Sequence, residues 1–276
     1  MTTVLTDKEF EQFQSLIYQQ VGIKLDPPKK TLLVSRLSKR LRELALTSFQ
    51  AYYDCVSREG GEEELTKMLD LISTNKTDFY REGIHFDFLR DKVLPEIRET
   101  KTLRVWSSAS SSGEEPYTIA MTLCDALPDI NRWDIKILAS DISTRVLAKA
   151  ASGMYEEERV SHLPKDVVLR HFLCGKGPQA GKYKIRPNVA KLVSFRRINL
   201  MDSTFPIRSS LDVIFCRNVM IYFDRSTQTQ LMKKFFHYLR PGGYLFIGHS
   251  ESLQWIEHQF TYLRPTIYQK PDKRES

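Results

Sequence analysis

The sequence lacks the cysteine spacing of zinc sites and of disulfide frameworks. Its four cysteines, at positions 55, 124, 174 and 216, are scattered along the chain without a C-x-x-C pair. Isolated cysteines in apolar surroundings are typical of reduced thiols in a cytoplasmic protein. We therefore expect no disulfide bonds and no bound metal.

Long apolar runs are also missing. Charged residues or Asn interrupt each apolar run before it reaches the length of a membrane span, and residues 1–9 do not have the basic-then-apolar order of a secretory signal. With 276 residues, of which 41% are hydrophobic and 27% charged, the chain has the composition of a globular protein of one or two domains. We expect a cytoplasmic protein that does not insert into membranes.

The stretch 103–121 reads as strand, loop and helix, but it lacks the glycine-rich pattern of dinucleotide sites. A buried-strand pattern ends near Trp106, and small polar residues follow as far as Gly113. The loop has one glycine instead of G-x-G-x-x-G, and Glu114 and Glu115 would repel a pyrophosphate. The pattern favours a phosphate-free cofactor such as S-adenosylmethionine, although an ordinary helix N-terminus would also explain it.

Asp141 follows the second predicted strand, at residues 135–140. An acidic residue at that place in an open α/β sheet accepts hydrogen bonds from ribose hydroxyls. Helix capping is the alternative, and Ser143 competes for that task. Because one β-α unit separates Asp141 from the first loop, ribose recognition is the favoured interpretation.

The order of predicted elements indicates an α/β fold behind an all-α N-terminal domain. Helical periodicity predicts four helices, at about 7–21, 29–46, 48–60 and 62–72, and a further helix at about 84–99. Strands and helices then alternate, which predicts a doubly wound, mostly parallel sheet ending in an antiparallel hairpin at 260–269. Residues 183–186 and 191–195 are predicted to form a small antiparallel pair beside this sheet.

Positive charge is concentrated near the N-terminus although the first segment is nearly neutral. Residues 1–73 contain ten Lys or Arg and eleven Asp or Glu, whereas residues 24–46 contain seven basic and two acidic residues. Arg36, Lys39 and Arg40 are spaced to share one face of the second predicted helix. The face is a candidate docking surface for an acidic partner, although a solvated helix face is the commoner explanation for such a charge run.

Five ordered motifs resemble the CheR family of chemotaxis receptor methyltransferases. They are Asn75-x-Thr77-x-Phe79-Tyr80-Arg81-Glu82, Ser111-Ser-Gly-Glu-Glu-Pro-Tyr117, Ala139-Ser-Asp-Ile142, Phe215-Cys-Arg-Asn-Val-Met-Ile-Tyr-Phe223 and Gly248-His-Ser-Glu-Ser252. The resemblance covers nearly the whole chain. It implies the class I methyltransferase fold, with a seven-stranded sheet, an antiparallel subdomain at about 175–196 and a helical N-terminal domain. It also implies a protein-glutamate O-methyltransferase that acts on the glutamates of chemoreceptors and releases S-adenosylhomocysteine.

The resemblance assigns roles to individual residues. It implies cofactor contacts at Asn75, Thr77, Arg81, Glu115, Asp141, Asn199, Leu200, Arg217 and Asn218. It places Arg81 and Tyr222 beside the reacting carboxylate. The turn departs from many family members at Ser108, Ala109, Ser110 and Ser112, but these are small-for-small changes, and we expect the turn to be kept.

The resemblance also implies a separate role for each of three segments of the chain. Residues 1–73 would face the receptor, residues 74–102 would contribute to the cofactor cleft, and residues 103–276 would form the methyltransferase domain. The partner would be the helical bundle of a chemoreceptor. In some family members the antiparallel subdomain, here residues 175–196, binds the receptor's C-terminal peptide as an added strand, and a simple surface hairpin is the alternative.

Two other functions are compatible with parts of the pattern. A class I methyltransferase acting on a nucleic acid or a small molecule is one, but no stripe of stacking aromatics and basic residues is visible. A binding module that senses S-adenosylmethionine without turnover is the other, and the presence of Arg81 and Tyr222 disfavours it. We therefore expect no nucleic-acid partner.

Overall fold

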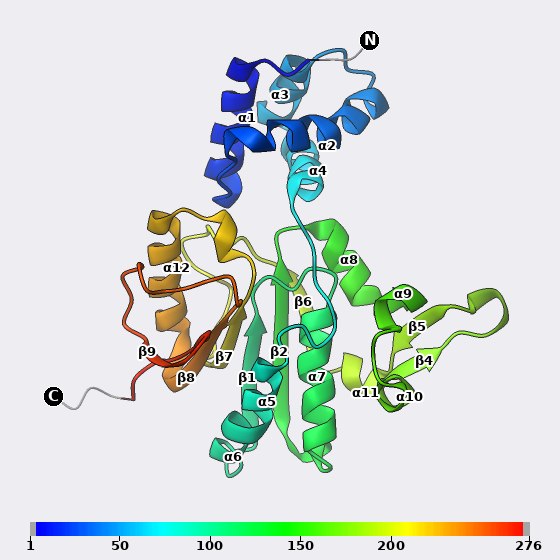
Figure 1. The fold of residues 1–276 in the computed structure, drawn as a ribbon, viewed down its shortest axis with the longest axis vertical. Helices are drawn as coiled ribbons and strands as arrows, with labels where there is room; N and C mark the ends of the chain where they lie inside the picture. Colours follow the sequence, from blue (N-terminus) through cyan, green and yellow to red (C-terminus); the bar gives the residue numbers. More distant parts are fainter. Residues whose placement is uncertain (1–3, 273–276) are drawn as a thin grey trace.

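The computed structural model describes residues 4–272, which form a helical lobe above an α/β domain (Figure 1). The lobe consists of α1 (Asp7–Val21), η1 (Pro27–Lys29), α2 (Lys30–Glu43), α3 (Phe49–Ser57) and α4 (Glu62–Ile72). Thr6 and Glu9 form a capping box at the start of α1. Gly22 ends α1 in the left-handed conformation, with φ 69°.

The lobe has its own hydrophobic core. Phe13 and Ile17 of α1 are fully buried, and they pack in the same cluster as Leu37 of α2 and Met68 of α4. The predicted apolar stripe of α2 is therefore confirmed at its centre. At its end Leu44 is only half-buried, because α2 stops at Glu43.

A helical segment joins the lobe to the sheet. It consists of α5 (Ile84–Phe88), the π-helical η2 (Leu89–Val93) and α6 (Leu94–Glu96). The sequence predicts one helix at about 84–99, and the helical conformation runs without interruption from Ile84 to Glu96, with one π-helical turn inside it. Its apolar residues pack on the sheet, and Leu89 and Val93 are fully buried.

The α/β domain is built on a seven-stranded sheet with the spatial order β6-β2-β1-β7-β8-β10-β9. The strands are β1 (Thr102–Ser107), β2 (Asp134–Asp141), β6 (Val193–Arg197), β7 (Leu211–Cys216), β8 (Leu239–Ile247), β9 (Thr261–Arg264) and β10 (Ile267–Gln269). The pairs β6–β2, β2–β1, β1–β7 and β7–β8 are parallel, and β10 is antiparallel to both β8 and β9. The predicted sheet and its C-terminal hairpin are therefore confirmed.

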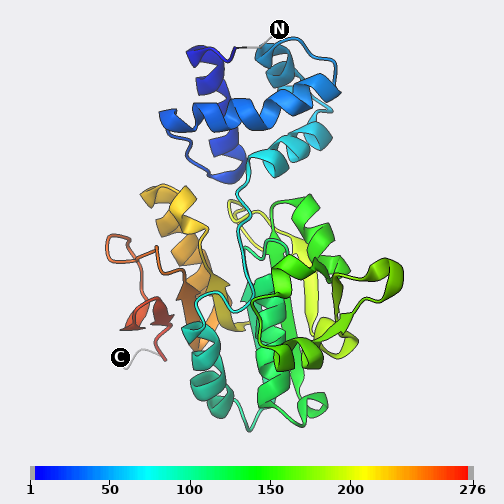
Figure 2. The ribbon, with the colours of Figure 1, turned by 45° about the vertical axis from the view of Figure 1, so that its right-hand side comes forward.

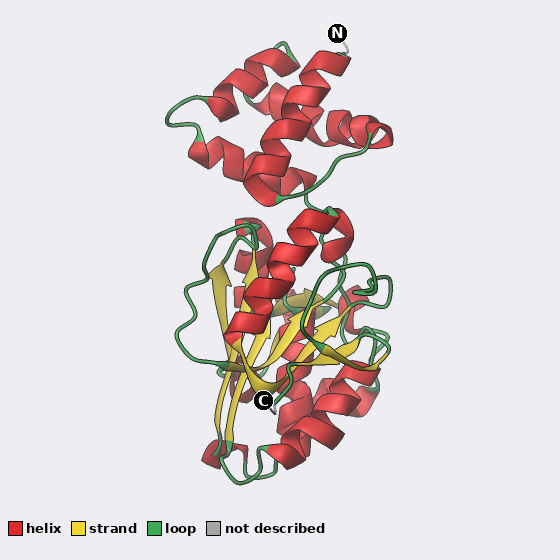
Figure 3. Ribbon diagram, turned by 90° about the vertical axis from the view of Figure 1, so that its left-hand side faces the viewer, coloured by secondary structure: helices red, strands yellow, loops and turns green. Residues whose placement is uncertain are grey.

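Helices cover both faces of the sheet (Figures 1 and 3). Val105 of β1 packs with α7 (Glu114–Ala126) on one face, and Trp106 packs with α12 (Arg225–Tyr238) on the other. Because side chains alternate along a strand, consecutive apolar residues fill two separate cores. The remaining helix on the sheet, α8 (Thr144–Ser152), lies between β2 and the lobe.

The antiparallel subdomain differs from the sequence prediction. Its three strands are β3 (Met154–Glu156), β5 (Lys182–Ile185) and β4 (Phe172–Cys174), in the order β3-β5-β4. The predicted pairing of 183–186 with 191–195 is wrong, because α11 (Pro187–Ala190) turns the chain and β6 joins the main sheet beside β2. Two further short helices belong to this region, α9 (Glu157–Val160) and α10 (Lys165–His171), and the subdomain projects to one side in Figure 2.

The lobe meets the α/β domain through polar contacts as well as the chain connection. Lys24 N–H donates to the carbonyl of Tyr222 at 2.9 Å, and the Tyr18 hydroxyl donates to Asp224 at 2.6 Å. On the other side of the junction, Asp70 of α4 accepts from the Thr144 hydroxyl at 3.0 Å. These contacts fix the lobe over the carboxyl ends of the parallel strands.

Within residues 4–272, each helix falls short of the combination of length and apolar character that a membrane crossing requires.

Candidate functional site

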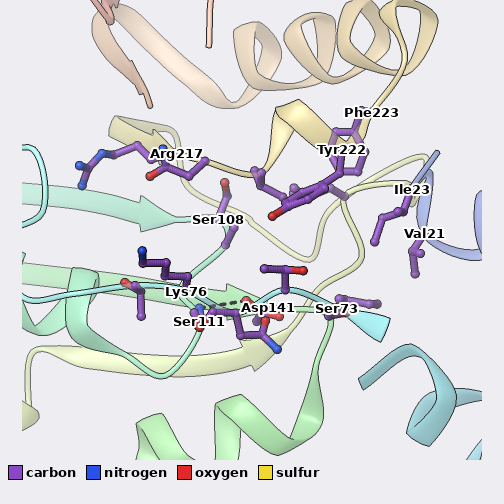
Figure 4. A pocket seen from close by; sticks show the side chains of 18 of the residues that line it. Val21, Ile23, Ser73, Lys76, Ser108, Ser111, Asp141, Arg217, Tyr222 and Phe223 are labelled. Atoms are coloured by element: carbon purple, nitrogen blue, oxygen red, sulfur yellow. Dashed lines mark hydrogen bonds between the residues drawn. The ribbon is translucent and has the colours of Figure 1, made fainter. Parts of the chain in front are cut away.

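A pocket lies between the lobe and the carboxyl ends of β1, β2 and β7 (Figure 4). Every residue predicted to contact the cofactor or the reacting carboxylate lines it: Asn75, Thr77, Arg81, Glu115, Asp141, Asn199, Leu200, Arg217, Asn218 and Tyr222. The structure therefore brings these ten side chains together from five separate stretches of sequence. The predicted docking residues Arg36, Lys39 and Arg40 do not line it.

The floor of the pocket is the loop between β1 and α7. Ser111 has φ 48° and Gly113 has φ 97°, so the chain turns sharply without a glycine-rich run. A Cβ at position 113 would lie 2.9 Å from both the Ala150 Cβ and the Tyr155 hydroxyl. The single glycine of the motif is therefore required by both the backbone conformation and close packing.

Asp141 lies at the end of β2, directly beside this loop. Its Oδ2 accepts from the backbone N–H of Ser111 at 2.9 Å, and its Oδ1 accepts from that of Ser143 at 3.0 Å. Burial raises the pKa of the Asp141 carboxyl above its usual range. Each carboxylate oxygen keeps a further lone pair, so Asp141 can still accept from a ligand hydroxyl in the pocket.

Glu115 and Arg217 form a buried ion pair. Arg217 Nη1 donates to Glu115 Oε2 at 3.0 Å, and the Ser107 hydroxyl donates to Glu115 Oε1 at 2.7 Å. Arg217 Nη2 donates to Glu82 Oε2 at 3.0 Å and to the carbonyl of Arg81. Burial raises the pKa of Glu115, because the neighbouring Arg217 offsets only part of the desolvation.

The segment from Asn75 to Arg81 forms one wall. The Asn75 carbonyl accepts from the Ser111 hydroxyl at 3.2 Å, which ties this wall to the floor. Arg81 Nη1 donates to the carbonyl of Lys76 at 3.0 Å, and the Arg81 side chain remains partly exposed. Its guanidinium therefore keeps donors that can meet a substrate.

Asn199, for which a cofactor contact is predicted, also makes hydrogen bonds within the protein. Its Nδ2 donates to the carbonyl of Gln20 in α1 at 2.6 Å, and its Oδ1 accepts from Met201 N–H at 3.0 Å. The side chain thus joins the lobe to the sheet while it lines the pocket. Leu200 beside it is buried and adds an apolar surface.

The opposite wall comes from the lobe and from η5 (Met220–Tyr222). Figure 4 shows Val21 and Ile23 approaching the pocket from the lobe side, facing Tyr222. Lys29 Nζ lies 5.8 Å from the centre of the Tyr222 ring. The lobe residues were missed by the sequence analysis, because their apolar character also fits a plain lobe core.

Glu82 and Glu251 are two further site residues that the motifs contain but that received no role. Glu251 accepts from the backbone N–H groups of Asn218, Met220 and Gly248 at 2.6 to 2.9 Å. It holds Asn218 in a left-handed conformation, with φ 59°. The signal in the sequence was the Gly248-His-Ser-Glu motif.

Glu82, His85 and His249 lie close enough together to hold a metal ion, a grouping that the sequence analysis did not single out. Both Glu82 oxygens already accept hydrogen bonds, from Arg217, from Asn218 and from the backbone of His249. Burial lowers the pKa of His85 to about 3, so its ring is neutral at physiological pH. The Arg217 guanidinium, 3.0 Å from Glu82, already supplies the positive charge that balances this carboxylate and would repel a cation bound beside it, and we assign no metal ion here.

The chemistry of the pocket suits a nucleoside with a charged amino-acid head and no phosphate. Among residues 4–272, Asn75 Nδ2 and Arg217 Nε are buried donors that have no hydrogen-bond partner, and both belong to residues that line the pocket. Glu115 and Asp141 supply acceptors, and Val21, Ile23 and Leu200 supply apolar surface. S-Adenosylmethionine, which carries a carboxylate, an ammonium, ribose hydroxyls and adenine, fits this set.

Comparisons with known proteins agree with this geometry. A family model described as the CheR methyltransferase SAM binding domain matches residues 75–269, and one described as the CheR methyltransferase all-alpha domain matches residues 8–73. The chain is 43% identical over 263 residues to chemotaxis protein methyltransferase 2 of Pseudomonas aeruginosa, covering 95% of this chain and 93% of the relative. It is 41% identical over 265 residues to the chemotaxis protein methyltransferase of Escherichia coli, with 96% and 91% covered. The corresponding protein of Borreliella burgdorferi is 40% identical over 274 residues, with 96% and 95% covered.

The substitution Asp141→Asn should weaken S-adenosylhomocysteine binding by about 1–3 kcal/mol, because an amide nitrogen replaces one of the carboxylate acceptors. Wild-type affinity should fall as the pH drops through the raised pKa of Asp141, since the protonated carboxyl accepts fewer hydrogen bonds. Calorimetric titration at several pH values measures both effects. Asp202→Asn, which changes an exposed carboxylate, is the control, and equal affinity in the two variants would contradict the assignment.

Proposed function

Because the chain belongs to the CheR methyltransferase family, we propose that it methylates glutamate side chains of chemoreceptors and so serves adaptation in chemotaxis. The family membership makes it an S-adenosylmethionine-dependent methyltransferase. In this proposal residues 1–73 face the receptor, residues 74–102 complete the cofactor cleft, and residues 103–276 carry the methyl transfer. The observation that carries the proposal is that Arg81 and Tyr222 line the same pocket as Glu115 and Asp141.

The cofactor would be held by the residues that fit its parts. Asp141 would accept from ribose hydroxyls, and Glu115, Arg217 and Asn75 would meet the charged amino-acid head. Thr77, Asn199, Leu200 and Asn218 would complete the enclosure. When bound, the cofactor supplies an electrophilic methyl group on a sulfonium.

The acceptor requires alignment more than proton removal. A glutamate is ionised near neutral pH, so no strong general base is needed. Arg81 would orient the incoming carboxylate through a charge-assisted hydrogen bond, and the neutral Tyr222 hydroxyl would hold it less tightly. Positioning of this kind lowers a barrier by up to roughly 7–11 kcal/mol.

A second hollow supplies a route for the acceptor. It is lined by Lys24, Lys29 and Arg225, and it shares Tyr222 with the cofactor pocket. Two carboxylates, Asp26 and Asp224, also line it, so its three basic residues leave a small excess of positive charge. The Asp224 carboxylate accepts from the Tyr18 hydroxyl and caps α12 by accepting from Thr227 N–H. An acidic helix that approached here would bring its glutamates to the catalytic pair.

The basic residues of α2 differ in how accessible their charges are to a docking partner. Arg40 donates to Glu64 at 2.7 and 2.6 Å and also contacts Glu43, and its side chain is only 19% exposed. Arg36 donates to the carbonyls of Ile72 and Ser73 at the end of α4. Lys39, with a side chain 78% exposed, has a charge that a receptor can reach, and Arg42 is also exposed. We therefore assign docking mainly to Lys39 and Arg42, with Arg36 and Arg40 holding the lobe together.

The subdomain is proposed to bind the C-terminal peptide of a receptor as an added strand. Leu173 of β4 lies opposite Lys184 of β5. Two backbone hydrogen bonds belong to the same ladder, one from Gly175 N–H to the Lys182 carbonyl and one from Arg186 N–H to the His171 carbonyl. In an antiparallel pair the alternate residue, Cys174, then directs its N–H and C=O toward the outer edge of β4. Leu173 and Cys174 are both exposed, so this edge can be approached.

The site of action is proposed to be the cytoplasm, where S-adenosylmethionine and the signalling bundles of chemoreceptors would both be met. The four cysteines are free, which is consistent with a reducing compartment.

Transfer of a radiolabelled methyl group from S-adenosylmethionine to receptor fragments, with tRNA as the comparison acceptor, tests the reaction itself. Labelling of tRNA alone would contradict the proposed substrate.

Arg81→Ala should lower kcat at least tenfold, because the free donors of the Arg81 guanidinium are assigned to the acceptor carboxylate. The Kd of S-adenosylhomocysteine should change little for the same reason. Tyr222→Phe should lower kcat more mildly, and full turnover in both variants would remove the catalytic assignment.

Charge reversal of the exposed α2 residues tests docking. Lys39→Glu combined with Arg42→Glu should raise the KM for receptor severalfold and reduce its salt dependence, with the Kd of S-adenosylhomocysteine unchanged. Arg40→Glu should instead lower the free energy of unfolding, because it leaves Glu64 facing a like charge. A KM that is indifferent to the double reversal would place the receptor elsewhere.

A proline at the edge strand tests the peptide site. Cys174→Pro removes an outward N–H while it leaves the β5 ladder intact, so it should abolish the heat of binding of receptor C-terminal peptides. Cys174→Ala is the matched control and should bind normally. Equal binding by both variants, with circular dichroism unchanged, would show that the peptide does not add at this edge.

A further inference from the structure

Arg159 joins the antiparallel subdomain to two walls of the cofactor pocket. It lies in α9, and its Nε and Nη2 donate to Glu114 Oε1 at 3.1 and 2.5 Å. Its Nη1 donates to Asp78 Oδ1 at 3.2 Å, and its Nη2 also donates to the carbonyl of Thr77. Arg159 itself does not line the pocket, whereas Thr77 and Asp78 do.

Glu114 is the fully buried partner of Arg159. Its side chain is 0% exposed, and its other oxygen, Oε2, accepts from the Ser112 hydroxyl at 2.7 Å. Glu114 stands in the first turn of α7, directly after the loop that forms the pocket floor. A carboxylate buried so completely needs a cation beside it, and among residues 4–272 its ion-pair partner is Arg159.

The contact with Asp78 leads to the proposed catalytic arginine. The backbone N–H of Arg81 donates to the carbonyl of Asp78 at 3.4 Å in the turn that follows. Asp78 therefore fixes the start of the turn that presents the Arg81 side chain. A guanidinium that holds Asp78, Thr77 and Glu114 at once sets the spacing between this wall and the floor.

A second contact from the subdomain supports the same floor. The Tyr155 hydroxyl of β3 donates to the carbonyl of Ser112 at 2.8 Å, and the Tyr155 side chain is buried. It also occupies the space that a Cβ at Gly113 would need. The subdomain thus braces the pocket floor through Tyr155 and links that floor to the wall through Arg159.

We propose that Arg159 is a positioning residue for methyl transfer, which sets the Thr77–Arg81 segment against the loop that precedes α7. The proposal rests on the cofactor site described above, and it assigns the subdomain a part in forming the site in addition to peptide docking. Arg159 touches neither the reacting atoms nor the surface of the pocket, so it acts through Glu114, Thr77 and Asp78. Its loss should loosen cofactor binding and misplace Arg81.

Arg159→Met should weaken S-adenosylhomocysteine binding about tenfold and lower kcat, while the KM for receptor stays the same. In the ligand-free protein, hydrogen exchange of the amides from 77 to 82 should become faster than in the wild type. Arg159→Lys keeps the charge but cannot span three partners, so it should recover part of the affinity. Arg170→Met, which breaks exposed ion pairs from α10 of the same subdomain to Asp125 of α7 and to Asp166, should change neither quantity.

A double-mutant cycle separates positioning from general stability. In the Glu114→Gln background, Arg159→Met should cost less cofactor affinity than in the wild type, because the main partner is already neutral. Wild-type affinity and exchange rates in Arg159→Met would overturn the proposal, as would a loss of unfolding free energy without a loss of affinity. If Arg159→Met does not fold, Arg159→Lys decides by the same two measurements. If receptors do not accept methyl groups, the proposed substrate is wrong. The test of Arg159 still holds in that case, because it measures cofactor binding by the free enzyme.

Discussion

The buried guanidinium of Arg217 is the interaction on which the candidate site depends. It stands just after β7, its side chain is 2% exposed, and it pairs with Glu115 at the start of α7 and with Glu82 after the linker segment. Removing one partner of such a buried pair typically costs about 3–5 kcal/mol, because the remaining charge cannot reach water. The arginine therefore holds a strand end, a helix start and the turn after Arg81 in one arrangement. Its unpartnered Nε leaves one donor available at the centre of that arrangement.

The helical lobe contributes to the pocket, in addition to the receptor-docking role proposed for it. Val21, Ile23 and Leu25 close one side of the pocket, and the hydrogen bond from Lys24 N–H to the Tyr222 carbonyl joins these lobe residues to η5 on the same side. Gly22 permits the turn that brings this segment to the pocket, because its φ of 69° lies in the left-handed region that favours glycine. A receptor helix that bound the lobe would press on a segment already in contact with Tyr222. If the receptor docks on the lobe as proposed, the hydrogen bond between Lys24 and Tyr222 would connect docking to the geometry of the pocket.

Much of the fold followed from local pattern, because the capping box at Thr6, the apolar periods and the strand-end motifs each act over a few residues. The pairing of β6 with β2 could not be predicted from local pattern, because the sequence around Val193 does not indicate which of the two sheets the strand joins. The basic face of α2 shows a similar limit. Spacing places Arg40 beside Lys39, but only the fold shows that Glu64 from another helix captures it. The motifs predicted residues that line one pocket, whereas the hydrogen-bond partners of those residues come from segments distant in sequence.

Two adjacent glutamates with the same sequence context have different ion-pair partners in the structure. Glu114 and Glu115 both suit the positive end of a helix, and nothing in their sequence context separates them. Because successive side chains of a helix project about 100° apart, Glu114 is directed away from the pocket toward Arg159 in the subdomain, and Glu115 is directed toward Arg217 in the pocket lining. Only Glu115 lines the pocket, and burial raises its pKa, so it is the member of the pair whose charge a cationic ligand would stabilise. The repulsion that disfavours a phosphate at this helix start is thus a property of Glu115, while Glu114 serves to connect the subdomain to the floor on which the ligand would lie.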